Sequence, residues 1–358
     1  MKKANKFLVT GSIALIFSLT GCASYVKVRL LKPSEFSLGP VKKLAVSNFN
    51  FTGNVYYNED NSLESLAVGA LVNTIMGKQV VNTNNSYSGS QASQIFTQKL
   101  FANGHYKIID KVNQINENNL SQIELSSLRN SLGAEAIIAG SGIYSVTDSG
   151  RWTDDVSYKN GVKITNKKYD INRRINTSLS YKVINTLNGE IIAAKTNSRT
   201  DTEDRSGVDQ DSARNSLRDW RGIITDQLEE LSDQSIKQIA PYYVFEDREV
   251  KEGKSYLMKQ GLQYAKKDLW QQAKANWETV LENKQVLTGD AKEDAIFATY
   301  NLGIYNEING DFSKAQELFS QCYKQSSKSE YIDAQNRVRM RQFEVQRLKN
   351  QGSLEINN

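Results

Sequence analysis

Hydrophobic and polar residues follow two different periods along this chain. Between residues 41 and 240, short alternating runs typical of strands are interleaved with longer runs of helical period. From residue 250 to residue 348 the helical period prevails. The pattern therefore predicts a mixed α/β domain over residues 41–240, followed by an all-α domain over residues 250–348.

The first domain is predicted to be a compact α/β sandwich, of the α+β or α/β class, with the element order β-α-β-α-β-β-β-α. In its first strand, Leu44 and Val46 alternate with Lys43 and Ala45. The strands are expected at residues 41–50, 106–110, 134–146, 174–183 and 189–196, and the helices at residues 91–103, 120–132 and 213–239. An Asn-Gly pair favours a tight turn between the last two strands.

The beginning of the chain has the pattern of a secretory signal. Three lysines precede an apolar stretch at residues 7–19, which is well short of the ~20 residues that a spanning helix needs. The four residues that end at Cys22 resemble a bacterial lipobox, which implies cleavage between Gly21 and Cys22 and a diacylglycerol on the Cys22 thiol. An ordinary signal peptide with an incidental cysteine is the alternative. The expected layout is a signal at residues 1–21 and a lipidated tether at residues 22–40.

Cleavage would change both the charge and the expected location of the protein. The full chain has a formal charge of +5, and loss of the three lysines in residues 1–21 leaves +2. Such a small charge gives little support to nucleic-acid binding. Ala23 and Ser24 lack the acidic residue that retains lipoproteins in the inner membrane. In a host that has an outer membrane, the resemblance therefore implies an outer-membrane anchor that faces the periplasm. The covalent lipid on Cys22 is the one cofactor expected.

Several motifs of the first domain occur in a recognisable order. They are a helix end at residues 96–100, a strand at 106–110, a helix-to-strand corner at 132–141 and a hairpin at 179–192. Their succession, over about residues 41–240, resembles the CsgG-like family of curli assembly and transport lipoproteins. The resemblance implies a non-enzymatic assembly or scaffold module in secretion or envelope biogenesis.

In the secretion channel of that family, two further hairpins of each subunit form a transmembrane barrel. A lipid-facing strand needs every second side chain to be apolar over ~9–11 residues. Residues 195–207 contain no large apolar side chain. In residues 151–170, a two-residue Asn-Gly turn would pair Val156 with Thr165, which places the few apolar groups on opposite faces. The chain is therefore predicted to lack a pore of its own.

The same hairpin has a basic bias. Its cations are Arg151, Lys159, Lys163, Lys167, Lys168, Arg173 and Arg174. Against three aspartates they give a net charge of +4. This charge could attract an acidic polymer, a lipid head group or an acidic protein. A soluble hairpin edge protected by charge is the alternative.

Glycine, alanine and aromatic residues recur 42 residues apart in the second domain. The pairs are Gly261 and Gly303, Ala273 and Ala315, and Trp277 and Phe319. The pattern resembles the tetratricopeptide repeat, which implies helix pairs and a groove for a protein partner. The usual period is ~34 residues, so extra residues are expected at 283–290, with a capping helix at 331–348 and a tail at 349–358. The residues expected to line the groove are Met258, Leu262, Tyr300 and Ile304.

Few residues could carry catalysis. The chain has one histidine and two cysteines, which excludes a site of several histidines and a disulfide framework. His105 is expected in a helix-to-strand turn, and the acidic residues between 201 and 211 in a solvated loop, because they lack the spacing of a calcium-binding loop. No metal site is expected. Cys322 is then an unpaired thiol, and residues 63–75 form a helix on the sheet or at an interface.

Two functions remain open. The first is a lipoprotein scaffold that recruits a protein partner through its helical repeats. The alternative is a lipoprotein that activates a peptidoglycan synthase. A homo-oligomer is compatible with both, and an enzyme is the least favoured class.

Overall fold

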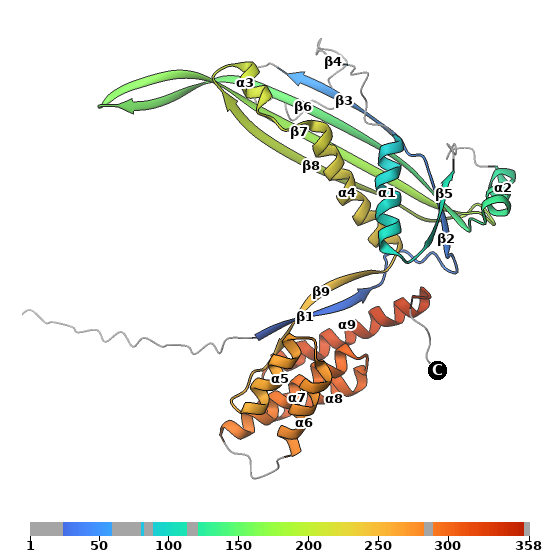
Figure 1. Cartoon of the computed structure of the whole chain (residues 1–358), viewed down its shortest axis with the longest axis vertical. Helices are drawn as coiled ribbons and strands as arrows, with labels where there is room; N and C mark the ends of the chain where they lie inside the picture. Colours follow the sequence, from blue (N-terminus) through green and yellow to red (C-terminus); the bar gives the residue numbers. More distant parts are fainter. Residues whose placement is uncertain (1–23, 59–79, 82–88, 113–120, 283–288, 354–358) are drawn as a thin grey trace, which may run out of the picture. The chain divides into compact units, whose positions relative to one another are not determined.

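The computed structural model describes residues 24–58, 80–81, 89–112, 121–282 and 289–353. Its contacts divide the chain into a sheet unit, residues 31–243 with those after 343, and a helical unit, residues up to 30 with residues 244–343 (Figure 1). A mixed α/β region is followed by an all-helical region of several helices, which confirms the predicted fold class. The predicted signal and Cys22 lie outside the described residues.

A mixed sheet of seven described strands forms the sheet unit. They are β2 (Lys43–Ser47), β3 (Asn50–Asn58), β4 (Val80–Val81), β5 (Lys107–Val112), β6 (Ala136–Lys159), β7 (Val162–Asn185) and β8 (Ile191–Gly207). Strand β6 is central. It pairs in parallel first with β2 and then with β3 on one edge, and antiparallel with β7 on the other. The predicted elements occur in the predicted order, with β3, β4 and a short helix in addition.

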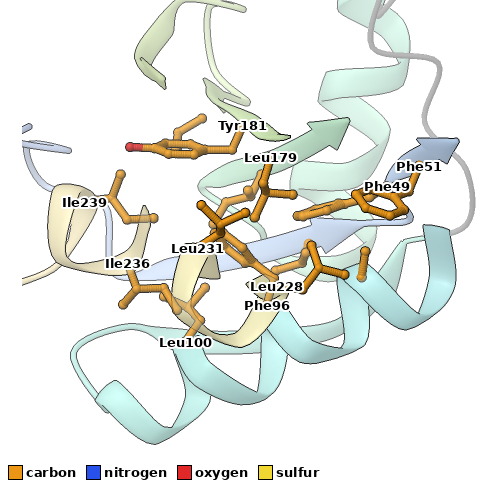
Figure 2. Close-up of a cluster of buried hydrophobic side chains, with 14 of the residues drawn as sticks. Phe49, Phe51, Phe96, Leu100, Leu179, Tyr181, Leu228, Leu231, Ile236 and Ile239 are labelled. Carbon is orange, nitrogen blue, oxygen red and sulfur yellow. The ribbon is translucent and has the colours of Figure 1, made fainter. Parts of the chain in front are cut away.

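Helices cover the two faces of this sheet unequally. Helices α1 (Gly89–Asn103) and α4 (Trp220–Ile239) lie on one face, and α2 (Gln122–Leu132) covers one end of the other (Figure 1). In the main core, Phe96 and Leu100 of α1 and Leu228 of α4 pack towards Leu179 and Tyr181 of β7 (Figure 2). Each fully buried side chain of this size stabilises the fold by ~1.5–3 kcal/mol.

The helical unit combines helices with a two-stranded ribbon. Strands β1 (Ser24–Lys32) and β9 (Tyr242–Val250) pair with each other. The helices are α5 (Tyr256–Lys266), α6 (Trp270–Glu282), α7 (Asp290–Ile308), α8 (Phe312–Ser326) and α9 (Glu330–Asn350). The part of α9 from Glu344 on belongs to the sheet unit, where Arg347 donates a hydrogen bond of 2.6 Å to the carbonyl oxygen of Ser34.

The recurring glycines lie where the paired helices touch. A Cβ on Gly261 would collide with the Trp277 ring, and a Cβ on Gly303 with the Phe319 ring. Each glycine therefore lets an aromatic side chain fill the space between two helices. Helix α7 has 19 residues and α5, which carries the other glycine, has 11. Of the residues expected to supply the extra length, 283–288 lie outside the described part of the chain.

Three local predictions are corrected by the structure. The predicted tether at residues 22–40 contains β1, and the border between the two predicted domains contains β9. The acidic residues at 201–204 lie on β8, because β8 pairs with β7 as far as Gly207. The helix predicted at residues 63–75 lies outside the described residues. Cys322 is buried and forms no disulfide, and among the described residues no helix has the length and apolar character to cross a membrane.

Candidate functional site

The ends of β6 and β7 leave the sheet as a two-stranded arm (Figure 1). Strand β3 pairs with β6 as far as Ser149, and β8 pairs with β7 as far as Tyr169. Beyond these positions, within the described part of the chain, β6 and β7 pair with each other alone, up to Lys159 and Val162. Residues 151–168 are called the β6–β7 ribbon below.

The turn of the ribbon fixes its register. Asn160 and Gly161 have φ angles of 52° and 77°, and positive φ at both central residues is typical of a type I′ turn. Val156 then lies opposite Thr165, as predicted. The apolar groups consequently fall on opposite faces, also as predicted.

An aromatic pair marks the base of the ribbon. The Trp152 ring stands edge-on to the Tyr169 ring, with centroids 5.3 Å apart. Tyr169 is buried, and a Cβ on Gly150 would collide with its ring. Tyr169 also packs with Ala213 of helix α3 (Gln210–Asn215). Packing of the hairpin against a helix therefore ends at Tyr169, and the β6–β7 ribbon begins at the next position.

Large apolar side chains are exposed on both faces of the ribbon. One face carries Trp152, Val156 and Tyr158, and the other carries Val162 and Ile164. Their exposed fractions range from 36% for Ile164 to 72% for Tyr158. Single exposed apolar residues are common on protein surfaces, whereas a cluster of them marks an interaction site. The sequence pattern separated the two faces, but it did not reveal that both lack a cover in the described part of the chain.

The charges of the ribbon are less basic than the sequence suggested. Arg151, Lys159, Lys163, Lys167 and Lys168 face two aspartates, which leaves a net charge of +3 over residues 151–168. Lys167 lies opposite Asp154, with Nζ 2.5 Å from Oδ1. At the base, the hydroxyl of Thr153 and the ammonium of Lys168 donate hydrogen bonds that lower the pKa of Asp170.

Two of the predicted basic residues lie outside the ribbon. Arg173 is buried in an ion pair with Asp148, so its charge is unavailable to a partner. This corrects the prediction for Arg173, which was based on sequence proximity without regard to the face that the side chain occupies. Arg174 is exposed, on the wider part of the sheet opposite Thr147.

The sheet face opposite α1 and α4 is mostly polar beyond the end covered by α2, with Ile143 exposed among the polar side chains. It carries Ser145, Thr147, Ser149, Asn172, Asn176, Ser178, Ser180, Thr196, Ser198, Thr200 and Thr202. Hydrogen bonds link its strands, as between Ser180 and Thr196 at 2.7 Å and from Thr200 to Asn176 at 2.7 Å. Most of these side chains hydrogen-bond across the strands, although the hydroxyl of Ser149 is buried without a partner among the described residues. This face therefore has less need of a cover than the β6–β7 ribbon.

The predicted groove residues are core residues. Met258, Leu262, Tyr300 and Ile304 have exposed fractions between 0% and 3%. Met258 and Leu262 pack in the core of the helical unit, and the Tyr300 ring lies against the Phe319 ring with centroids 5.2 Å apart. The prediction that these four side chains line a binding groove is therefore wrong. Helical spacing identifies an apolar face, but it does not say whether that face is covered.

The candidate catalytic residues have structural partners. His105 lies between α1 and β5, as predicted, with its ring edge-on to Tyr106 at 4.5 Å. Burial and then the positive charge of Lys42 lower the pKa of His105. Among the described residues, no group of three or more His, Cys, Asp or Glu could hold a metal ion.

The acidic residues on and after β8 are each engaged locally. Asp201 accepts hydrogen bonds from Arg199 and Gln227, which lower its pKa although burial raises it. Glu203 pairs with Arg205, and Asp209 caps the N-terminus of α3. Asp204 accepts a hydrogen bond from Asn172, and Asp211 lies in the first turn of α3. These contacts account for the acidic cluster without a bound cation.

Comparison with known proteins gives a partial family match and distant structural likenesses. Residues 259–350 match the family described as Domain of unknown function (DUF6340). A search of curated proteins finds no match.

Solved structures resemble the fold over a little more than half of the chain. A PelC dodecamer from Paraburkholderia phytofirmans is 14% identical, covers 61% of this chain and 100% of its own, and has a TM-score of 0.25. Lipoprotein GNA1162 from Neisseria meningitidis is 8% identical, with 54% and 97% covered and a TM-score of 0.24. A minor lipoprotein from Acinetobacter baumannii is 10% identical, with 55% and 91% covered and a TM-score of 0.17. Two of these three structures are described as lipoproteins, and at such identities and TM-scores the likeness transfers no function.

Proposed function

We propose that this chain is a non-enzymatic lipoprotein, anchored through a lipid on Cys22 in the outer membrane and facing the periplasm. It uses the β6–β7 ribbon to hold a protein partner during secretion or envelope assembly. The observation that carries the proposal is the exposure of five large apolar side chains on a ribbon that the described residues leave uncovered. The anchor is supported by the lipobox that ends at Cys22.

The composition of the ribbon suits a protein surface better than water. A two-stranded hairpin alone is at best marginally stable, so a partner that covers it would also stabilise its strands. Trp and Tyr are enriched at protein interfaces because they combine a large apolar area with a polar group. The net charge of +3 favours a partner with an acidic surface. Apolar groups on both faces, interspersed with lysines, do not form the continuous lipid-facing side that a pore strand needs.

Photo-crosslinking in intact cells tests the partner. A photoreactive amino acid at Tyr158 should give specific adducts with a protein, whereas the same group at Tyr256 serves as a control of similar exposure, 75% against 72%. Equal adduct patterns at the two positions would contradict binding through the ribbon.

The identity of the adduct separates the open alternatives. Secretion components favour the scaffold, cell-wall synthases favour activation of a peptidoglycan synthase, and a second copy of the chain indicates a homo-oligomer. A partner that binds the helical unit instead would have to use exposed residues such as Met340 and Phe343, since the four predicted groove residues are buried.

The anchor has a separate test. Cells grown with labelled palmitate should incorporate the label into the wild-type chain and not into a Cys22→Ala variant. Fractionation should then place the labelled chain with the outer membrane. A wild-type chain without label would exclude the lipid anchor and leave the ordinary signal peptide.

A further inference from the structure

The β1–β9 ribbon has two chemically different faces. Val26, Val28 and Val250 are buried, with Val26 and Val250 in the core that also contains Met258 and Trp277. The opposite face alternates with them and is open to solvent. One face of the β1–β9 ribbon therefore packs on the helices of its unit, and the other face can contact a partner.

The open face carries exposed aromatic rings and charged side chains of both signs. Tyr25 is 60% exposed and Phe245 is 68% exposed. Lys27 and Arg29 are exposed on the same side of β1 as Tyr25. Lys27 pairs with Asp247 of β9 at 3.6 Å, with both side chains more than half exposed. Aromatic rings beside cations are the combination that is enriched at the interface between a bilayer and water.

The position of this face along the chain indicates its partner. Cys22 precedes Ser24, the first residue of β1, by two positions. Since one residue spans at most ~3.6 Å, a lipid on Cys22 would hold Tyr25 within about 11 Å of the membrane surface. An amphipathic element that lies at a membrane surface buries its apolar face about 5–10 Å deep among the head groups and the upper acyl chains. The covalent anchor therefore brings this face into reach of the head groups.

We propose that the open face of the β1–β9 ribbon, with Tyr25, Phe245 and Lys27, rests on the membrane surface next to the lipid anchor. This inference rests on the lipidation of Cys22 that is part of the proposed function. A lipid alone retains a protein but lets it rotate about its tether. A second contact through a rigid ribbon fixes which side of the helical unit faces the bilayer.

Vesicle binding of the unlipidated protein tests the contact directly. The chain from residue 22 on, with Cys22→Ser, keeps every residue that the structure describes and carries no lipid. It should bind vesicles of phosphatidylethanolamine and phosphatidylglycerol weakly in a flotation assay. A Tyr25→Ser, Phe245→Ser variant should lose about tenfold in partition coefficient, because two exposed rings no longer enter the interface.

Two further variants make the result specific. Tyr256→Ser removes an exposed aromatic side chain of the helical unit that lies outside the β1–β9 ribbon. It should change the partition coefficient less than about twofold. Lys27→Gln should weaken binding to vesicles that contain phosphatidylglycerol and leave binding to neutral vesicles unchanged, because it removes an attraction to anionic head groups. The same melting temperature in all variants would show that folding is unaffected.

The proposal is overturned if the parent chain does not bind the vesicles. It is equally overturned if the Tyr25→Ser, Phe245→Ser variant binds as well as the Tyr256→Ser variant. This measurement uses a chain without lipid, so it is independent of the palmitate labelling that tests the anchor. A chain that binds vesicles but takes up no palmitate would contradict the lipid anchor alone. A chain that takes up palmitate but does not bind vesicles would contradict the membrane contact alone.

Discussion

The guanidinium of Arg173 on β7 lies directly opposite the carboxylate of Asp148 on β6 and donates a hydrogen bond of 2.7 Å to each of its oxygens. Both residues are buried, and Arg173 also donates to the carbonyl oxygen of Arg218 just before α4. Each charge thus has its partner inside the protein. The pair lies where the segment that leads into α4 contacts the β6–β7 hairpin, whereas the β6–β7 ribbon lies beyond this point.

Breaking this pair should destabilise the sheet unit strongly. Asp148→Ala leaves the guanidinium of Arg173 buried without its counter-charge, and we expect the free energy of unfolding to fall by about 3–5 kcal/mol. Urea denaturation measures the loss.

A matched pair on the same two strands provides the control. Asp154 lies opposite Lys167 in the ribbon, and both side chains are exposed. Asp154→Ala should therefore cost less than about 1 kcal/mol. If Asp148→Ala and Asp154→Ala lower the free energy of unfolding equally, burial does not determine how much the Asp148–Arg173 pair contributes to stability.

The close approach of helices in the helical unit makes a second prediction. Gly303→Ala should destabilise the unit by about 1–3 kcal/mol, because the added methyl group collides with Phe319 and this outweighs the better helix propensity of alanine. Phe319→Leu in the same chain should recover part of the loss by making room. Thermal unfolding checks both variants, and a stabilising Gly303→Ala would refute the packing argument.

The strands and helices of the sheet unit could be predicted because their patterns are local and strong. The register of the β6–β7 hairpin followed from its Asn-Gly turn, which places Val156 opposite Thr165. The same register, continued along the strands, places Asp148 opposite Arg173. Sequence reasoning could therefore have found this pair, and it would have removed Arg173 from the list of exposed cations.

The remaining errors arise from contacts between distant parts of the chain. Strands β1 and β9 are separated by the entire sheet domain in sequence, so each looked like a linker. The alternation of Val26 and Val28 with exposed residues was a signal for β1. Met258 and Ile304 lie on apolar helix faces, but their complete burial depends on neighbouring helices that the sequence does not place.

The thiol of Cys322 should be unreactive in the native protein. Burial raises its pKa to about 12, so at pH 8 it is protonated and shielded, and in a Cys22→Ser chain it is the remaining thiol. Reaction with a disulfide reagent at pH 8 should be at least about 100-fold slower without urea than in denaturing urea. Comparable rates would show that the helical unit opens readily around α8.

The raised pKa also predicts a pH dependence of stability. The unfolded thiol loses its proton near its ordinary pKa of 9.0, whereas the native thiol keeps it up to about pH 12. The stabilisation is therefore complete below pH 9 and is lost as the pH rises from 9 to 12. The free energy of unfolding of the parent should fall over this range relative to that of a Cys322→Val variant, which has no thiol to titrate. A constant difference between the two would contradict the pKa shift.

The β6–β7 ribbon should contribute to binding of the protein partner without contributing to the stability of the fold. Tyr158→Ser with Ile164→Ser removes one exposed apolar side chain from each face, and we expect the free energy of unfolding to change by less than about 0.5 kcal/mol because both side chains lie at the surface. Recovery of the crosslinked or co-purified partner should nevertheless fall at least about tenfold.

Ile143→Ser is the matched control, because Ile143 is 65% exposed on β6, as Tyr158 is, but lies outside the β6–β7 ribbon. Light scattering of the detergent-solubilised lipoprotein measures the mass of the complex for each variant. If Ile143→Ser lowers that mass as much as the ribbon variant does, the partner binds the broad polar face of the sheet and the assignment to the ribbon is wrong.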